Sequence, residues 1–227
     1  MNKSIQLAPS ILTADFARIG DEVRSVSDIV DWFHLDVMDG HYVPNLTFGP
    51  STVEAINKSC ENPLHVHLMI TDPAQFAPEF AAAGADRISF HPEAVDDPDE
   101  VIDELEALGV GAGLAVHPDI PLSRVEPYVE RLDVLLMMTV RPGFGGQTFL
   151  DEVLPKIADA HRLIQETGAR ADIEVDGGVN ISTIDRVVDA GVEIVVAGSA
   201  VFDGVDARAA AKKLRERLDV LAGSKVK

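Results

Sequence analysis

Residues 172–197 read DIEVDGGVNISTIDRVVDAGVEIVVA and hold a complete strand–helix–strand unit. Apolar runs predict strands at Asp172–Val175 and Glu193–Ala197. Between them, the apolar residues of Ile181–Val188 recur at helical spacing, and Gly191 follows as a typical helix cap. A strand, a helix and a second strand in this order predict two parallel strands joined by a crossover helix.

The same alternation continues along the whole chain. Six further strands are predicted at Ile5–Leu12, Trp32–Met38, Leu64–Ile70, Asp86–Phe90, Ala112–Val116 and Asp133–Val140. Eight strand–helix pairs in 227 residues are typical of an α/β fold, the (β/α)8 TIM barrel. A doubly wound open sheet is the alternative, but it usually has fewer strands, and the first strand–helix turn lacks a G-x-G-x-x-G motif.

The composition excludes several classes of protein. The chain has 19 Lys and Arg against 38 Asp and Glu, a formal net charge of −19. This charge opposes binding to nucleic acid and to anionic membranes. A hydrophobic content of 46% argues against disorder, and no apolar run approaches the roughly 20 residues of a membrane helix. Because no linker or low-complexity stretch interrupts the pattern, we expect residues 1–227 to form a single domain.

Cellular location and assembly are predicted only in outline. Cys60 is the single cysteine, so no intramolecular disulfide can form, and the first residues lack the apolar run of a signal peptide. We therefore expect a cytoplasmic protein. Barrel enzymes often associate, so a homo-oligomer is expected, without a predicted number of subunits.

Polar residues lie where the interior of a barrel is otherwise apolar. Side chains alternate between the two faces of a strand, so the inward-facing residues are His34, Asp36 and Met38 on one strand, His65, His67 and Met69 on the next, and Glu174 and Asp176 near the end of another. His34, Asp36, His67 and Asp176 are therefore expected to converge at the mouth of the barrel. Two imidazoles and two carboxylates suit a divalent transition metal. Two structural histidines bonded to two buried aspartates are the alternative.

Three glycine-rich segments follow the sixth, seventh and eighth predicted strands. They are Arg141–Gln147, Asp176–Gly178 and Gly198-Ser199. Backbone N–H groups in such loops bind anions, and the last two loops of a barrel are a frequent phosphate site. The pattern favours phosphate over glycines that only make tight turns. By themselves, Ser10 is typical of a turn or cap, and Met38, Met69 and Met138 are typical of core packing.

Taken together, these motifs resemble the ribulose-phosphate 3-epimerase family. The matching segments are Leu7–Leu12, His34–Gly40, Val43–Asn45, Val66–Met69, Met138–Val140, Pro142–Gln147, Glu174–Gly178 and Ala197–Ala200. They span essentially the whole chain in family order. The resemblance implies a barrel of the ribulose-phosphate-binding type and an isomerase of the pentose phosphate pathway, which interconverts D-ribulose 5-phosphate and D-xylulose 5-phosphate.

The resemblance also implies a role for each matching residue. One divalent metal ion (zinc, iron, manganese or cobalt) is held by His34, Asp36, His67 and Asp176. Asp36 and Asp176 form the acid/base pair on opposite faces of the sugar. Ser10, His67 and Asp176 contact the substrate, and Met38, Met69 and Met138 shape the pocket beside the planar intermediate. The phosphate lies against the glycine loops, at Gly143, Phe144, Gly145, Gly146, Gly177, Gly178, Gly198 and Ser199.

The chemistry agrees with this assignment. Epimerisation at C3 removes a proton next to the C2 carbonyl on one face and returns one on the other, so two carboxylates are needed. A metal ion stabilises the resulting enediolate as a Lewis acid. Neither a nucleophile nor a redox cofactor is required.

Three positions depart from the family pattern, and three other functions stay open. His65 stands where Asp is common, His117 where Asn is common, and Arg141 where Glu or Asn is common. The nearest alternative is a 3-epimerase of a six-carbon ketose phosphate such as allulose 6-phosphate. A metal hydrolase using His65, His67 and Asp176 would need further ligands that the chain lacks. A non-catalytic sugar-phosphate sensor would be expected to have lost Asp36 or Asp176.

Overall fold

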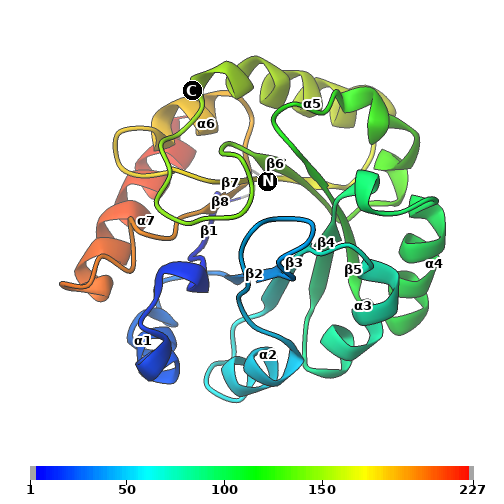
Figure 1. Ribbon diagram of the computed structural model, residues 1–227. Helices are drawn as coiled ribbons and strands as arrows, with labels where there is room; N and C mark the ends of the chain where they lie inside the picture. The colour runs from blue at the N-terminus through cyan, green and yellow to red at the C-terminus, as the bar shows by residue number, and fades with distance from the viewer. Residues whose placement is uncertain (1–3, 225–227) are drawn as a thin grey trace.

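Eight parallel strands form the centre of the protein. The structure is a computed structural model that describes residues 4–224. The strands are β1 (Gln6–Ala8), β2 (Phe33–Met38), β3 (Leu64–Met69), β4 (Arg87–Phe90), β5 (Gly111–Val116), β6 (Val134–Met138), β7 (Asp172–Asp176) and β8 (Ile194–Val196). They pair in the order β1-β8-β7-β6-β5-β4-β3-β2. A parallel bridge between Ser10 and His34 joins the two outer strands, which confirms the TIM barrel (Figure 1).

Helices surround this barrel on the outside (Figure 1). They are α1 (Ile19–Val26), α2 (Pro50–Asn57), α3 (Pro73–Ala82), α4 (Pro98–Leu108), α5 (Leu154–Thr167), α6 (Ile184–Asp189) and α7 (Ala207–Ser224). The expectation of a helix after every strand is wrong at one place. Between β5 and β6 the chain forms two 3₁₀ helices, Leu122–Arg124 and Glu126–Arg131.

The predicted strands are longer than the observed ones at four C-terminal ends. The largest difference is in β1, which ends at Ala8 instead of Leu12. Pro9 cannot donate a backbone hydrogen bond, and Ser10 then caps the 3₁₀ helix Ile11–Thr13, its side chain accepting from the Leu12 N–H. The chain therefore turns at Ser10, and the serine reaches the mouth of the barrel. The strands β3, β6 and β8 also end earlier than predicted, at Met69, Met138 and Val196.

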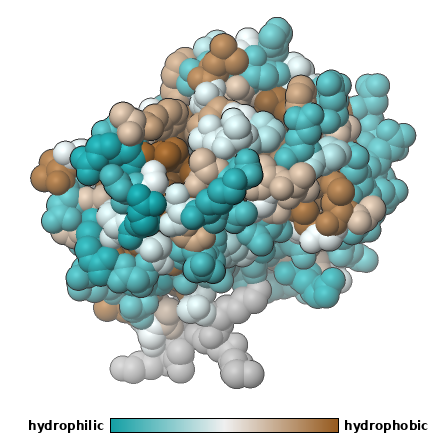
Figure 2. Space-filling view, turned by 90° about the horizontal axis from the view of Figure 1, so that it is seen from below, coloured by the Kyte–Doolittle hydropathy of each residue, from teal (hydrophilic) through white to brown (hydrophobic). Residues whose placement is uncertain are grey.

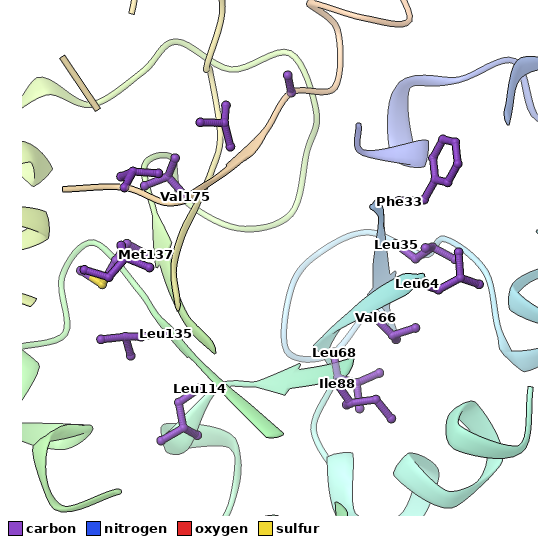
Figure 3. Packing of buried hydrophobic residues seen from close by; sticks show 14 of the residues in the cluster. Phe33, Leu35, Leu64, Val66, Leu68, Ile88, Leu114, Leu135, Met137 and Val175 are labelled. Carbon is purple, nitrogen blue, oxygen red and sulfur yellow. The ribbon is translucent and has the colours of Figure 1, made fainter. Parts of the chain in front are cut away.

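Two packing layers explain why the strands are buried on both faces. Outward-facing residues such as Phe33, Leu35 and Val66 pack in one large cluster between the strands and the helices (Figure 3). Inside the barrel the apolar clusters are small. One contains Ala8, Ile194 and Val196, and another contains Ala115, Leu136 and Met138. The remaining interior of the barrel is free to hold polar side chains.

The surface is mostly hydrophilic. Figure 2 shows one side of the molecule, on which hydrophilic residues predominate and hydrophobic ones are scattered. Within residues 4–224, no helix is both long enough and apolar enough to cross a lipid bilayer.

Candidate active site

A pocket opens at the C-terminal end of the barrel. Strand ends form its floor, and the loops after β6, β7 and β8 form its rim. The predicted residues that line it are Ser10, Asp36, Met38, Met69, Met138, Gly143, Phe144, Gly145, Gly146, Asp176, Gly177, Gly178, Gly198 and Ser199. His34 and His67, also predicted, do not line it. They are fully buried below the floor.

The four predicted metal ligands lie together, with Asp36 and Asp176 at the floor of the pocket and the two histidines buried beneath it. His34, Asp36, His67 and Asp176 each offer one ligand atom, and these atoms all lie within 4.8 Å of one another. Asp36 Oδ1 is 3.2 Å from His34 Nε2 and 3.1 Å from His67 Nδ1. Both imidazoles therefore face the same carboxylate, that of Asp36.

The hydrogen bonds of the two histidines suit a metal ion. His34 Nδ1 donates to Glu174 Oε1 at 2.9 Å, whereas its Nε2 has no hydrogen-bond partner of acceptable geometry among the described residues. His67 Nε2 is 3.0 Å from His91 Nε2, which leaves Nδ1 directed at Asp36. A buried nitrogen without a partner is costly unless a ligand uses it. One nitrogen of each ring is thus oriented by the protein while the other faces the carboxylates, as in metal-binding histidines.

The two aspartates differ in protonation behaviour. Burial and the neighbouring Asp36 carboxylate raise the pKa of Asp176 to about 8. Burial also opposes ionisation of Asp36, but His34 and His67 outweigh it and hold the pKa of Asp36 below its usual range. Ligand atoms of the two carboxyl groups lie within 4.8 Å of each other, so the two groups titrate as a pair and ionisation of Asp36 opposes that of Asp176.

The rim after β7 and β8 presents backbone donors. Gly177 and Gly178 have φ angles of +120° and +67°, which L residues rarely adopt. A Cβ on Gly178 would lie 2.5 Å from the backbone nitrogen of Phe149, so no side chain fits there. In the part of the chain that the structure describes, no acceptor faces the backbone N–H groups of Gly177, Gly178 and Ser199. Unpaired N–H groups at one edge of a pocket form a site for an anion.

The loop after β6 covers the pocket from another side. Asn45 donates to the carbonyl of Gly143 at 2.9 Å, and Gln147 donates to the carbonyls of Arg141 and Phe144 at 2.7 and 2.8 Å. These bonds tie the loop to itself and to the loop after β2. The ring of Phe144 is 54% exposed although it borders the pocket.

Ser10 and the three methionines complete the floor. The Ser10 hydroxyl donates to Asp36 Oδ2 at 2.6 Å, so both oxygens of this carboxylate are held. Met38, Met69 and Met138 are nearly fully buried and reach the pocket with part of their surface. The wall that faces a bound ligand on this side is therefore apolar and carries no proton donor from these residues.

Sequence reasoning missed His91, the neighbour of His67. His91 follows β4 and contacts His67, and its Nδ1 lies 3.4 Å from Glu93 Oε1. Glu93 in turn accepts from the Tyr42 hydroxyl at 2.8 Å. The available signal was the period of two in the fourth strand, which directs Ser89 and His91 to the same inward face.

The three departures from the family pattern lie in different places. His65 is buried beside Glu174 and Ser89, one layer below the floor. His117 and Arg141 do not line the pocket. Asp119 lies between them, its N–H donating to His117 Nδ1 at 3.1 Å and its carboxylate accepting from Arg141 at 3.2 Å.

Solved structures of several barrel enzymes resemble this one. The 3-hexulose-6-phosphate synthase of Salmonella typhimurium matches with a TM-score of 0.74 and 20% identity, over 96% of this chain and 100% of that chain. KGPDC from Streptococcus mutans matches with a TM-score of 0.72 and 14% identity, over 96% and 99% of the two chains. At these identities the likeness establishes the fold alone.

Sequence relatives establish the family. The model of the ribulose-phosphate 3 epimerase family matches residues 6–202. The ribulose-phosphate 3-epimerase of Bacillus subtilis is 47% identical over 186 residues, which are 81% of this chain and 86% of that protein. That of Escherichia coli K12 is 44% identical over 187 residues, 82% and 83% of the two chains. The chain therefore belongs to the ribulose-phosphate 3-epimerase family of enzymes.

Proposed function

We propose that this enzyme interconverts D-ribulose 5-phosphate and D-xylulose 5-phosphate at C3, with residues 1–227 acting as one catalytic domain. The observation that carries the proposal is the pairing of Asp36 and Asp176. They stand on β2 and β7, separated around the barrel by β1 and β8, and both line one pocket. Carboxylates that face a ligand from two sides suit removal of a proton on one face and its return on the other.

Both carboxyl groups are directed at the same centre. Ser10 and His67 hold the two oxygens of Asp36, at 2.6 and 3.1 Å, so the group cannot rotate away from the sugar. Asp176, at the end of β7, directs its carboxyl group at the same centre. In one direction of the reaction one aspartate accepts the C3 proton and the other donates to the opposite face. In the reverse direction the roles exchange.

A divalent metal ion fits the same residues. His34, Asp36, His67 and Asp176 would hold it, and the unpartnered Nε2 of His34 supports this set. Bound there, the ion would act as a Lewis acid that stabilises negative charge on the oxygens next to C3. Two imidazoles and two carboxylates suit zinc, iron, manganese or cobalt.

The remaining pocket residues support a sugar phosphate as the ligand. The backbone donors of Gly177, Gly178 and Ser199 would receive the phosphate, and the loop after β6 would exclude water. Met38, Met69 and Met138 would cover the planar intermediate without offering it a proton. A six-carbon ketose phosphate has the same reacting atoms, so it is the second candidate substrate.

Solvent deuterium exchange tests the reaction and the substrate together. In deuterated water the enzyme should place deuterium at C3 of ribulose 5-phosphate while forming xylulose 5-phosphate, as followed by proton NMR. Allulose 6-phosphate, run in parallel, should exchange much more slowly. Faster exchange with the six-carbon sugar would replace the proposed substrate, and no exchange with either would contradict the proposed reaction.

A further inference from the structure

A chain of four buried side chains crosses the barrel below the pocket floor. The Ser89 hydroxyl is 2.7 Å from His65 Nε2, and His65 Nδ1 is 2.9 and 3.0 Å from the two oxygens of Glu174. Glu174 Oε1 also accepts from His34 Nδ1 at 2.9 Å. All four side chains come from different strands, β4, β3, β7 and β2. None is more than 1% exposed.

The chemistry of these groups fixes the direction of each hydrogen bond. An ionised carboxylate only accepts, so both Nδ1 atoms that face Glu174 must donate. His65 Nε2 must then accept, and the Ser89 hydroxyl is the donor beside it. The ring of His34 is left with Nε2 directed at Asp36, 3.2 Å away. The series of hydrogen bonds therefore ends at His34, whose Nε2 faces the proposed metal ion.

A glycine on the neighbouring strand leaves room for these hydrogen-bonded side chains. Gly113 on β5 stands opposite Ser89 in the sheet. A Cβ at Gly113 would lie 2.1 Å from Ser89 Oγ and 2.5 Å from Val134 Cγ1. A larger residue at this position would displace the serine hydroxyl from its place beside His65.

His65 also fixes the orientation of the Glu174 carboxylate. Within residues 4–224, Glu174 Oε2 has His65 Nδ1 as its hydrogen-bond partner, while Oε1 is shared between His65 and His34. Without His65, a buried carboxylate oxygen would lose its donor, which is costly, and the group would rotate to find another. Rotation would remove Oε1 from His34 and release the orientation of its ring.

We propose that His65, supported by Ser89, is a positioning residue for the metal centre, acting through Glu174 on the orientation of His34. The inference rests on the metal site proposed above. Loss of a group that orients a metal-bound histidine typically weakens metal affinity about 10- to 100-fold. His65→Phe, which keeps a ring but removes both nitrogens, should show a loss of this size.

The test measures Co²⁺ binding to the apoprotein by competition with a chelator, together with the visible absorption spectrum of the bound ion. We expect His65→Phe to bind more weakly and to shift the spectrum, and Ser89→Ala to do both to a smaller extent. Val66→Ala is the matched control, because Val66 is the next residue on β3 and packs against the helices. It should lose stability and keep the wild-type affinity and spectrum.

Each outcome decides between the proposals. Wild-type affinity and spectrum in folded His65→Phe would overturn the positioning role, and if that variant does not fold, the same result in Ser89→Ala would overturn it. Two Co²⁺ ions per chain would also overturn it, because His34, His65 and Glu174 would then be ligands of a second ion instead of hydrogen-bond partners. Failure of the wild type to bind Co²⁺ would contradict the metal site itself, whereas deuterium exchange at C3 tests the reaction separately.

Discussion

The floor of the pocket and its rim are built from different parts of the chain. The floor consists of side chains, above all Asp36, which Ser10 and His67 hold in place, and Asp176. The rim consists of backbone N–H groups in loops, and at Gly178 the neighbouring backbone leaves no room for a side chain. Substitutions at the floor should therefore change the reaction itself, whereas substitutions at the rim should change how tightly the ligand is held.

The largest effect is expected at the floor. Asp36→Asn and Asp176→Asn keep the shape of the side chain but remove its ability to exchange a proton. Each should lower kcat for epimerisation by about 10³-fold or more, because no second carboxylate replaces the lost one. The measurement is the rate of xylulose 5-phosphate formation, with circular dichroism to confirm folding.

Asp185→Asn is the control for this pair of variants. Asp185 lies on α6 and pairs with Arg217 at the surface, so its loss should leave kcat unchanged. If either floor variant kept a tenth of the wild-type kcat, the assignment of the acid/base pair would be wrong.

A smaller effect, on binding, is expected at the rim. Gly178→Ala places a Cβ against the backbone of Phe149 and forces an L residue into a left-handed conformation. The loop must shift, and its N–H groups should then form weaker hydrogen bonds to a phosphate. We expect KM to rise by about tenfold, as for a lost hydrogen bond to a charged group, with a smaller change in kcat.

Gly204→Ala is the control that separates the steric clash at Gly178 from the backbone strain of a left-handed L residue. Gly204 has a similar φ angle, +76°, but a Cβ at this position would meet no atom within 4 Å, and the residue does not line the pocket. This variant should lose stability and keep the wild-type KM. An unchanged KM in Gly178→Ala would mean that the rim does not bind the phosphate.

The period of two along the strands predicted most of the floor. It directed His34, Asp36 and His67 inward, and the structure brings them together with Asp176. The partners of these residues could not be predicted in the same way, because they come from distant parts of the chain. His65 and Glu174 are 109 residues apart, and only the closure of the barrel makes them neighbours.

Local exceptions to the strand–helix pattern were also missed. Pro9 accounts for one of them, since it ends β1 early, and between β5 and β6 the chain forms 3₁₀ helices instead of the expected α-helix. The first exception matters for function, because the turn after Pro9 carries Ser10 to Asp36. The pattern of apolar residues contains no information about that contact.

The smallest expected effect is that of salt on KM. It follows from the absence of charged side chains among the described loop residues that line the rim of the pocket. The chain carries a formal charge of −19, and the residues that line the pocket include no Lys or Arg. Arg141, in the loop after β6, pairs with Asp119. Among the described residues, no cationic side chain of the pocket lining attracts a phosphate, and the net negative field of the protein repels it.

Raising ionic strength from about 50 mM to about 500 mM shortens the screening length and should weaken this repulsion. We expect KM for ribulose 5-phosphate to stay constant or to fall by up to about twofold, in steady-state assays with sodium chloride. A basic side chain at the rim would produce the opposite trend, because salt would screen its attraction for the phosphate. A several-fold rise in KM would therefore show that a cation binds the phosphate, and Asp119→Asn, which frees Arg141, would show whether that residue can supply one.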